Sequence, residues 1–257
     1  MPRSFASRFA CLFLAFSVIP SSLSQSRPGA SAAALPSKEA LTYNIEWRLI
    51  YAGAARLSVE PKGSNSEAKL HLESGGLVSK LYKVDDNYTV DMDEHFCGIK
   101  TELDAVERNR HHETKVEYDR ARGKAIYVER DVLKNAVIKT AEADIQGCVS
   151  DIVAGLYKIR MTRLEPGQSA QIALSDGKKT VSARVDAKAR EQIKTKAGTF
   201  NTIQYEAFVF NGVLYARKAQ LLIWLSDDAR KVPVQIRLRM SFPIGSITLE
   251  LVKEEHS

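Results

Sequence analysis

The chain has 257 residues, of which 37 are basic and 31 acidic, and 44% of them are hydrophobic. The net charge of +6 is a mild surplus spread along the whole chain, so we do not expect a nucleic-acid-binding surface. The length allows one large domain with a substantial core, and no segment after the N-terminal region is apolar enough to cross a membrane as a helix.

Residues 1–24 are typical of a secretory signal. Arg3 and Arg8 form a basic region ahead of a short apolar run from Phe9 to Ile19. Residues 25–38 are rich in Ser, Ala and Pro, which predicts a flexible leader. We therefore expect a protein that is exported to the periplasm or secreted.

From residue 39 to residue 254 the dominant hydrophobic period is two, which predicts a single β-rich domain. In the first expected strand one face carries Tyr43, Ile45, Trp47 and Leu49. Similar runs with short links follow, giving roughly a dozen strands that should pair antiparallel and curl. Two successive β lobes are an alternative arrangement.

One stretch follows the spacing of an amphipathic helix instead. Its apolar residues recur three and four positions apart, as expected for a helix near residues 149–161: Val149, Ile152, Val153, Leu156 and Tyr157. Ser150 or Asp151 can cap its first amides. The predicted fold is thus mostly β: a large curled antiparallel sheet or open β-barrel with one packed α-helix. A shorter stretch, residues 76–82, could form one or two further helical turns.

Two cysteines, Cys97 and Cys148, remain after signal removal. In an oxidising compartment they can pair, and the bridge would stabilise the fold by about 4 kcal/mol because it closes a long loop. Two separate buried thiols are equally compatible with the sequence.

The residues that could support catalysis do not form a known motif. Asp227 and Asp228 are adjacent carboxylates, but a polar hairpin turn with Arg230 and Lys231 as counter-charges explains them better. The run His111-His112-Glu113 lacks the spacing of a helical zinc motif. There is no Gly-x-Ser-x-Gly sequence and no glycine-rich phosphate loop. We therefore predict no catalytic residue, no metal and no cofactor.

Four aromatic residues on expected strands, Tyr43, Trp47, Phe208 and Trp224, suggest a different kind of site. Core packing explains most such residues. A curled sheet that is not completely filled can also present them on a concave apolar surface that binds an acyl chain.

Several segments together resemble the exported bacterial family catalogued as domain of unknown function 3108. They are Leu41–Leu57, Asp151–Arg160, Leu164–Gly167, Thr195–Phe200, Ile223–Pro233 and Gly245–Leu251. The resemblance implies a periplasmic or surface location and a β-rich fold, and it supplies no reaction. Asp151 and Arg160 stand out as polar positions of the family-like helix. The outline is also similar to that of LolA/LolB-type lipoprotein carriers.

These observations favour an exported, non-catalytic protein that binds a hydrophobic or amphiphilic envelope ligand, such as a lipid, lipoprotein or glycolipid. The alternative is a structural partner of an envelope protein in envelope assembly or polysaccharide export, with basic faces at Arg237/Arg239 and Lys194/Lys196. A hydrolase that uses His112 or the two aspartates is the third hypothesis.

Overall fold

The computed structural model describes residues 38–256, so the predicted signal and almost all of the leader lie outside the described residues. The strands are β1 (Glu39–Trp47), β2 (Ile50–Lys62), β3 (Asn65–Ser74), β4 (Val84–Met92), β5 (Gly98–Glu107), β6 (Arg110–Asp119), β7 (Lys124–Asp131), β8 (Ala136–Asp144), β9 (Ser169–Ser175), β10 (Thr180–Thr195), β11 (Gly198–Ala207), β12 (Ala219–Ser226), β13 (Pro233–Met240) and β14 (Ser246–His256). The helices are α1 (Gly76–Leu81) and α2 (Ile152–Met161).

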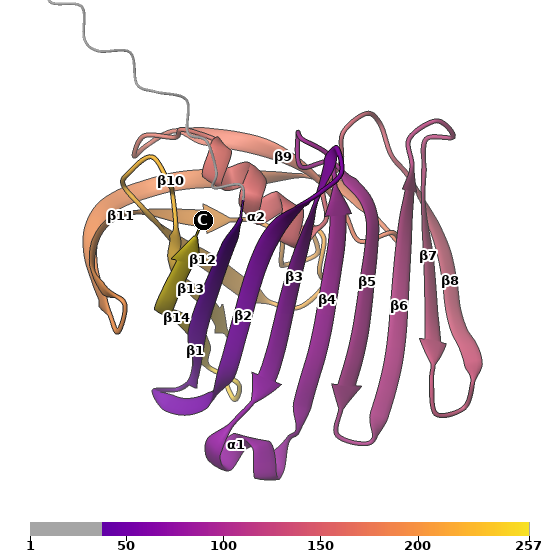
Figure 1. Ribbon diagram of the computed structural model, residues 1–257, viewed down its shortest axis with the longest axis horizontal. Helices are drawn as coiled ribbons and strands as arrows, with labels where there is room; N and C mark the ends of the chain where they lie inside the picture. The colour runs from indigo at the N-terminus through magenta and orange to yellow at the C-terminus, as the bar shows by residue number, and fades with distance from the viewer. Residues whose placement is uncertain (1–37, 257) are drawn as a thin grey trace, which may run out of the picture. The chain divides into compact units, whose positions relative to one another are not determined.

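All the strands belong to one 14-stranded sheet, and each neighbouring pair is antiparallel (Figure 1). The order runs from β8 back to β1, then to β14 and back to β9. The first and last strands therefore lie side by side at the middle of the sheet. The predicted mostly β fold is confirmed, as one continuous sheet rather than two lobes.

The sheet curls until it is nearly closed into a barrel. Its two edge strands, β8 and β9, do not pair with each other. Residues Val149 and Ser150 lie between β9 and the start of β5. The Gly98 amide donates to the Val149 carbonyl at 2.8 Å, and the Ser150 amide donates to the Ala173 carbonyl of β9 at 3.0 Å. β9 is thus joined to β5 by a short extended segment, and the Tyr118 hydroxyl of β6 donates to the Ser175 carbonyl at the end of β9 at 2.9 Å. β8 and β9 themselves share no ladder, so strand pairing does not seal the seam between them.

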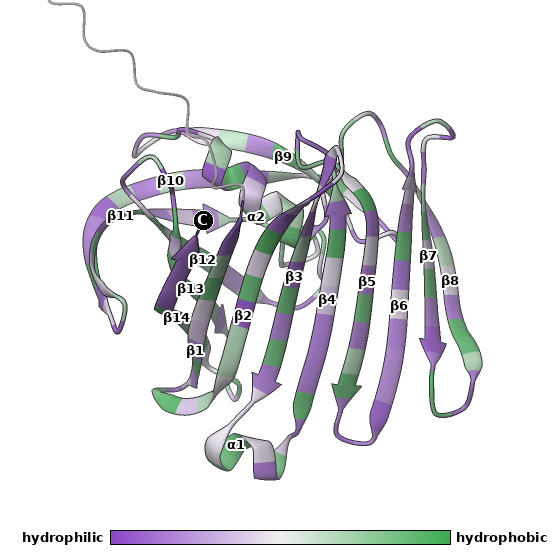
Figure 2. Ribbon diagram, in the orientation of Figure 1, coloured by the Kyte–Doolittle hydropathy of each residue, from purple (hydrophilic) through white to green (hydrophobic). Residues whose placement is uncertain are grey.

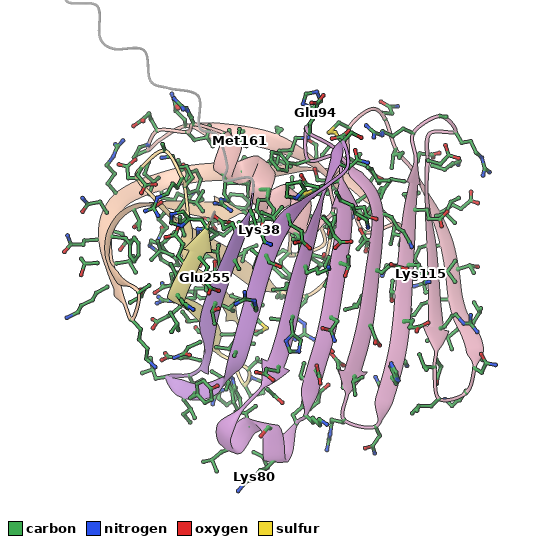
Figure 3. All side chains as sticks on the ribbon, in the orientation of Figure 1. Lys38, Lys80, Glu94, Lys115, Met161 and Glu255 are labelled. Atoms are coloured by element: carbon green, nitrogen blue, oxygen red, sulfur yellow. A yellow bond between two sulfur atoms is a disulfide. The ribbon has the colours of Figure 1, made fainter. Side chains whose placement is uncertain are left out.

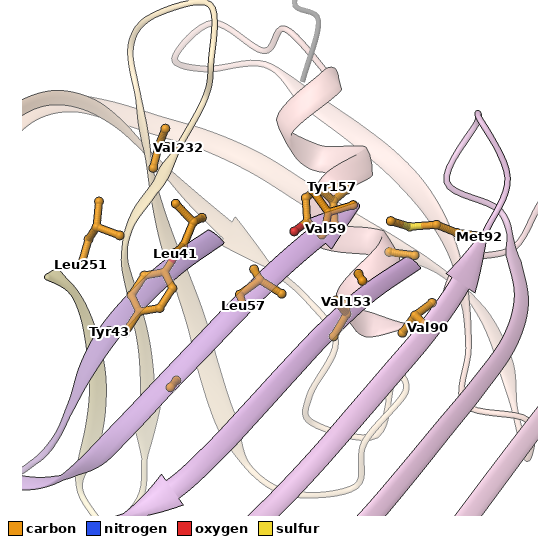
Figure 4. Close-up of a cluster of buried hydrophobic side chains, with 13 residues drawn as sticks. Leu41, Tyr43, Leu57, Val59, Val90, Met92, Val153, Tyr157, Val232 and Leu251 are labelled. Carbon is orange, nitrogen blue, oxygen red and sulfur yellow. The ribbon is translucent and has the colours of Figure 1, made fainter. Parts of the chain in front are cut away.

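The expected helix is present as α2 and lies inside the curl (Figure 1). It begins at Ile152, because Asp151 has extended backbone angles and its carboxylate accepts a hydrogen bond from the Ala154 amide at 2.7 Å. Figure 4 shows Val153 and Tyr157 of α2 meeting Val59 and Met92 of the sheet in one apolar cluster. A second cluster joins Ile159 to β9–β12.

The first strand differs from its prediction at its end. β1 stops at Trp47, and the chain reverses through Arg48 and Leu49. Leu49 was expected on the inward face with Tyr43, but it is 91% exposed at the tip of the turn. The alternating pattern continues through this turn without the Gly or Asn that usually marks a tight hairpin, so no local signal predicts the turn.

A buried ion pair holds the C-terminal end of α2 against the sheet. The guanidinium of Arg160 donates to both carboxylate oxygens of Glu39 on β1, at 2.6 and 2.7 Å, and both side chains are fully buried. Arg160 also donates to the carbonyls of Lys231 and Arg230 in the turn between β12 and β13. This one side chain connects the helix, the first strand and a distant turn.

Replacing Arg160 with Leu should lower the free energy of unfolding by about 3–5 kcal/mol, because it leaves the Glu39 carboxylate buried without its counter-charge. The double variant Glu39→Leu/Arg160→Leu should regain most of that loss. Urea denaturation monitored by circular dichroism measures both changes. Lys38→Leu, which breaks a solvent-exposed pair with Glu60, serves as the control and should change stability little. Equal losses in the single and the double variant would contradict this assignment.

Candidate functional site

The concave side of the sheet holds an apolar cavity of about 270 Å³ beneath α2. Its roof is the face of α2 that carries Ile152, Leu156 and Ile159. Its walls come from β1–β3 on one side and β9–β14 on the other: Tyr43, Leu57, Leu70, Leu72, Ile172, Leu174, Ala183, Val185, Ala207, Leu221, Ile223, Ile236 and Leu249, with Val209 from the segment after β11. The cavity surface is entirely apolar. Such a space favours hydrocarbon over water, because water needs polar partners.

The roof is close to β9 but does not fill the space below it. Gly155 allows the close approach, because a Cβ atom there would lie 2.8 Å from a methyl carbon of Leu174. α2 packs on the sheet through Val153 and Tyr157 in one apolar cluster and Ile159 in the other. The cavity is the space that remains.

The N-terminal end of α2 is held as firmly as its C-terminal end. Cys97 and Cys148 form a disulfide whose Cα atoms are 5.0 Å apart, so the pairing that the sequence left open is present here. The Ser150 hydroxyl donates to the Phe96 carbonyl at 2.6 Å, next to that disulfide. Burial raises the pKa of the capping Asp151 carboxyl, and the hydrogen bond from the Ala154 amide opposes that rise.

One carboxylate lies next to the cavity on the concave face. Asp86 of β4 is directly paired with Leu72 of β3, so the two side chains share a face. Its Oδ1 atom is buried and has no hydrogen-bond partner among residues 38–256. Burial, followed by the negative charge of Glu107, raises the pKa of Asp86 to about 6. A backbone hydrogen bond from Val106 to the carboxylate opposes this rise, so Asp86 has one oxygen with no partner beside an otherwise apolar site.

Of the four aromatic residues proposed as ligand contacts, the structure places only Tyr43 in the cavity wall. Its hydroxyl donates to the Pro233 carbonyl at 2.8 Å, so the ring faces the cavity without a free polar group. Trp47 lies at the end of β1, where its indole N–H donates to the Ile244 carbonyl. Trp224 alternates with the inward Ile223 along β12 and so faces the convex side.

Both aromatics on the convex side are covered by cations. The guanidinium of Arg237 lies 5.2 Å from the Trp224 ring, and the indole N–H donates to Glu191. Phe208 has the Arg184 guanidinium 4.4 Å from its ring. These two aromatics therefore lie away from the cavity, and the aliphatic side chains that form most of its wall were not singled out in the sequence.

The polar residues that the sequence analysis weighed for catalysis contact neighbouring side chains or backbone groups. Asp228 accepts hydrogen bonds from the Ser226 hydroxyl and the Arg230 amide within its turn, and Asp227 pairs with Arg190. His112 lies 3.3 Å from a Glu129 oxygen. Within residues 38–256 no group of three or more His, Cys, Asp or Glu side chains is placed to hold a metal ion. Neither helix of that part of the chain could traverse a bilayer.

Comparison with known proteins places the chain in a family. Residues 42–252 match the family described as Protein of unknown function (DUF3108), and the chain belongs to that family. No protein with a curated description matches the chain.

Two solved structures are similar in outline. A β-barrel-like protein of the domain of unknown function DUF1849 from Brucella abortus aligns with a TM-score of 0.58 and 9% identity, over 88% of this chain and 100% of its own. This likeness supports the barrel-like fold alone. A Bacteroides fragilis NCTC 9343 protein with a YmcC-like fold aligns with a TM-score of 0.33 and 10% identity, over 87% of this chain and 99% of its own, which is too low to support an argument.

Asp86→Asn should change stability relative to the wild type by an amount that grows with pH. The raised pKa means that the folded protein holds this proton more tightly than the unfolded chain, so the contribution of Asp86 to the free energy of unfolding falls as pH rises from 3.8 to about 6. At pH 7.5 the variant should be more stable than the wild type by about 1 kcal/mol, a value reduced because the group is half exposed. Urea midpoints between pH 3.5 and 7.5 measure this, with the exposed Glu94→Gln as control. A constant difference across that pH range would contradict it.

Proposed function

We propose that this member of the family binds the hydrocarbon part of an amphiphilic envelope molecule, a lipid, lipoprotein or glycolipid, and does not transform it. The observation that carries the proposal is the cavity under α2, whose wall is entirely apolar. An ordinary core would close such a space, because protein interiors pack as densely as organic crystals.

The size of the cavity suits a small hydrophobic guest. Its volume of about 270 Å³ is close to the lower end of the usual range for ligand pockets, roughly 300–1,000 Å³. Engineered apolar cavities of about 150 Å³ already stay free of water and take up benzene. A segment of an acyl chain is the envelope component whose shape and polarity fit this space.

The position of Asp86 supports an amphiphile over a purely apolar guest. Its side chain shares the concave face with Leu72, which lines the cavity. An unpartnered buried carboxylate oxygen is costly, and a hydroxyl or amine on the ligand could donate to it. The proposed ligand therefore places its tail under α2 and a donor-bearing head group near Asp86.

The disulfide supports the proposed location outside the cytoplasm. Stable disulfides form in oxidising compartments, and the predicted signal in residues 1–24 would direct the chain to one. The periplasm or the extracellular space is the location that we propose.

The alternative, docking of an acidic polymer on a basic face, has less support. Arg237, one of the residues suggested for that role, covers the Trp224 ring and approaches the Thr248 hydroxyl, so its guanidinium is engaged within the sheet. We therefore prefer the cavity as the functional site.

Organic extracts of the natively purified protein should contain an amphiphile, detected by mass spectrometry, at near one molecule per chain. Leu70→Trp should fill the cavity and reduce uptake of a fluorescent fatty acid at least tenfold, since it displaces the tail from its apolar contacts.

The matched control is Leu133→Trp, the same substitution at a position that is largely exposed and outside the cavity. It should leave fatty-acid uptake unchanged. Extracts that repeatedly contain no amphiphile, together with equal uptake by both variants, would refute the proposal.

A further inference from the structure

Exposed apolar side chains gather on neighbouring turns at one end of the sheet. We call this surface the apolar rim and define it by Arg48–Tyr51 between β1 and β2, Leu77–Lys83 in and after α1, and Phe242–Ile244 between β13 and β14. The four most exposed apolar side chains on the rim are Leu49, Phe242, Leu81 and Leu77. Because the order of strands is β3-β2-β1-β14-β13, the three turns lie next to one another (Figures 1 and 2).

Hydrogen bonds lock two of these turns together. The Trp47 indole N–H and the Arg48 Nε atom both donate to the Ile244 carbonyl, at 2.7 and 3.1 Å. The Arg48 amide donates to the Ser246 carbonyl, and its guanidinium lies 5.5 Å from the Trp47 ring. Leu49 and Phe242 are thus held out on a common, rigid support.

Tyr51 connects the first turn to α1. Its ring packs so closely on the start of the helix that a Cβ atom at Gly75 would lie 2.8 Å from a ring carbon. At the other end of α1, the Arg108 guanidinium lies 5.4 Å from the Tyr82 ring, and the Tyr82 hydroxyl donates to Glu107. The rim is therefore a continuous surface with aromatic rings among its exposed leucines.

The backbone at the tip of the first turn is strained. Arg48 and Leu49 both have positive φ angles, 49° and 69°, in a two-residue hairpin where Asn-Gly would fit without cost. A bulky side chain in this conformation costs free energy, and its leucine gains little burial in return. The turn therefore presents an apolar side chain to solvent at a cost that its burial does not offset.

The charge of the rim has one sign. Residues 48–51, 77–83 and 242–244 contain Arg48, Lys80 and Lys83 and no acidic residue. Figure 3 shows Lys80 projecting from the helix at this end. Within the described part of the chain, none of these three cations forms an ion pair with a carboxylate.

We propose that the apolar rim docks on the surface of an anionic lipid bilayer. Leu49, Leu77, Leu81 and Phe242 would enter the boundary between head groups and acyl chains, with Tyr51 and Tyr82 at head-group level. The three cations would then lie among the lipid phosphates.

A second copy of the chain is a poorer occupant for this surface. A symmetric dimer brings the same patch of both copies together, so Arg48, Lys80 and Lys83 would face their own counterparts without a carboxylate between them. A bilayer presents phosphates in any arrangement, and it can accommodate apolar side chains that project from separate turns. The proposal does not depend on what the cavity binds.

Flotation with vesicles tests the docking surface. The protein used is residues 25–257, the chain without the predicted signal, which contains every strand of the sheet. It should float with vesicles of phosphatidylcholine and phosphatidylglycerol, and much less with phosphatidylcholine alone. Leu49→Ser/Leu81→Ser/Phe242→Ser should weaken binding on the order of a hundredfold, because three side chains lose their insertion into the bilayer.

Lys80→Gln/Lys83→Gln should weaken binding by about fivefold per lysine at low salt. The matched control is Val137→Ser/Ile138→Ser, which removes exposed apolar side chains from edge strand β8, away from the rim. All of these positions are exposed, so thermal unfolding should be nearly unchanged in every variant.

Three results would overturn the proposal: no flotation of the wild-type segment, equal weakening in the rim and β8 variants, or a concentration-dependent dimer in light scattering that the rim substitutions abolish. The fatty-acid uptake assay on the rim variants keeps the two proposals separate. Fatty-acid uptake should be normal in the rim variants. A variant that loses vesicle binding and keeps normal uptake therefore tests the rim without testing the cavity.

Discussion

The buried pair between Arg160 and Glu39 is the constraint on which the interior of this protein depends. It holds one end of α2 to the first strand, and the disulfide between Cys97 and Cys148 holds the chain just before the other end. An apolar helix without such anchors would settle onto the nearest sheet surface and close the space beneath it. Here the ends are fixed by charge and by a covalent bond, so the position of α2 is not decided by apolar packing alone. An apolar interior space is the result.

The same strands serve the cavity and the rim at different points along their length. Leu72 lines the cavity only two residues before β3 ends, and the chain then enters α1. Tyr43 lines the cavity on β1, and four residues later Trp47 supports the turn that carries Leu49. Short stretches of strand therefore separate the apolar interior from the exposed apolar turns. A hydrocarbon chain that moves between a bilayer and the cavity would pass over these stretches.

Local pattern in the sequence was enough to predict the strands and α2, because alternating and helical spacing depend only on neighbouring residues. The partner of Arg160 was not predictable, because Glu39 is 121 positions away and an ion pair leaves no periodic signal. The faces of Phe208 and Trp224 were also missed. Alternation separates the two faces of a strand, but it does not show which face becomes the concave one. Here both aromatics lie on the outer face, where basic side chains cover them. The turn at Arg48 and Leu49 was missed because these residues break the usual preference for Gly and Asn.

The unpaired seam between β8 and β9 has a consequence for what fixes the girth of the curled sheet. In a closed barrel the girth is fixed by strand number and stagger, so a wider guest requires broken ladders. Here the edge strands β8 and β9 share no ladder. β9 is held instead by the segment Val149–Ser150 and by the hydrogen bond from the Tyr118 hydroxyl to the Ser175 carbonyl. The girth of the curl is therefore set by these few bonds and by side-chain packing around Ala173 rather than by a closed ladder.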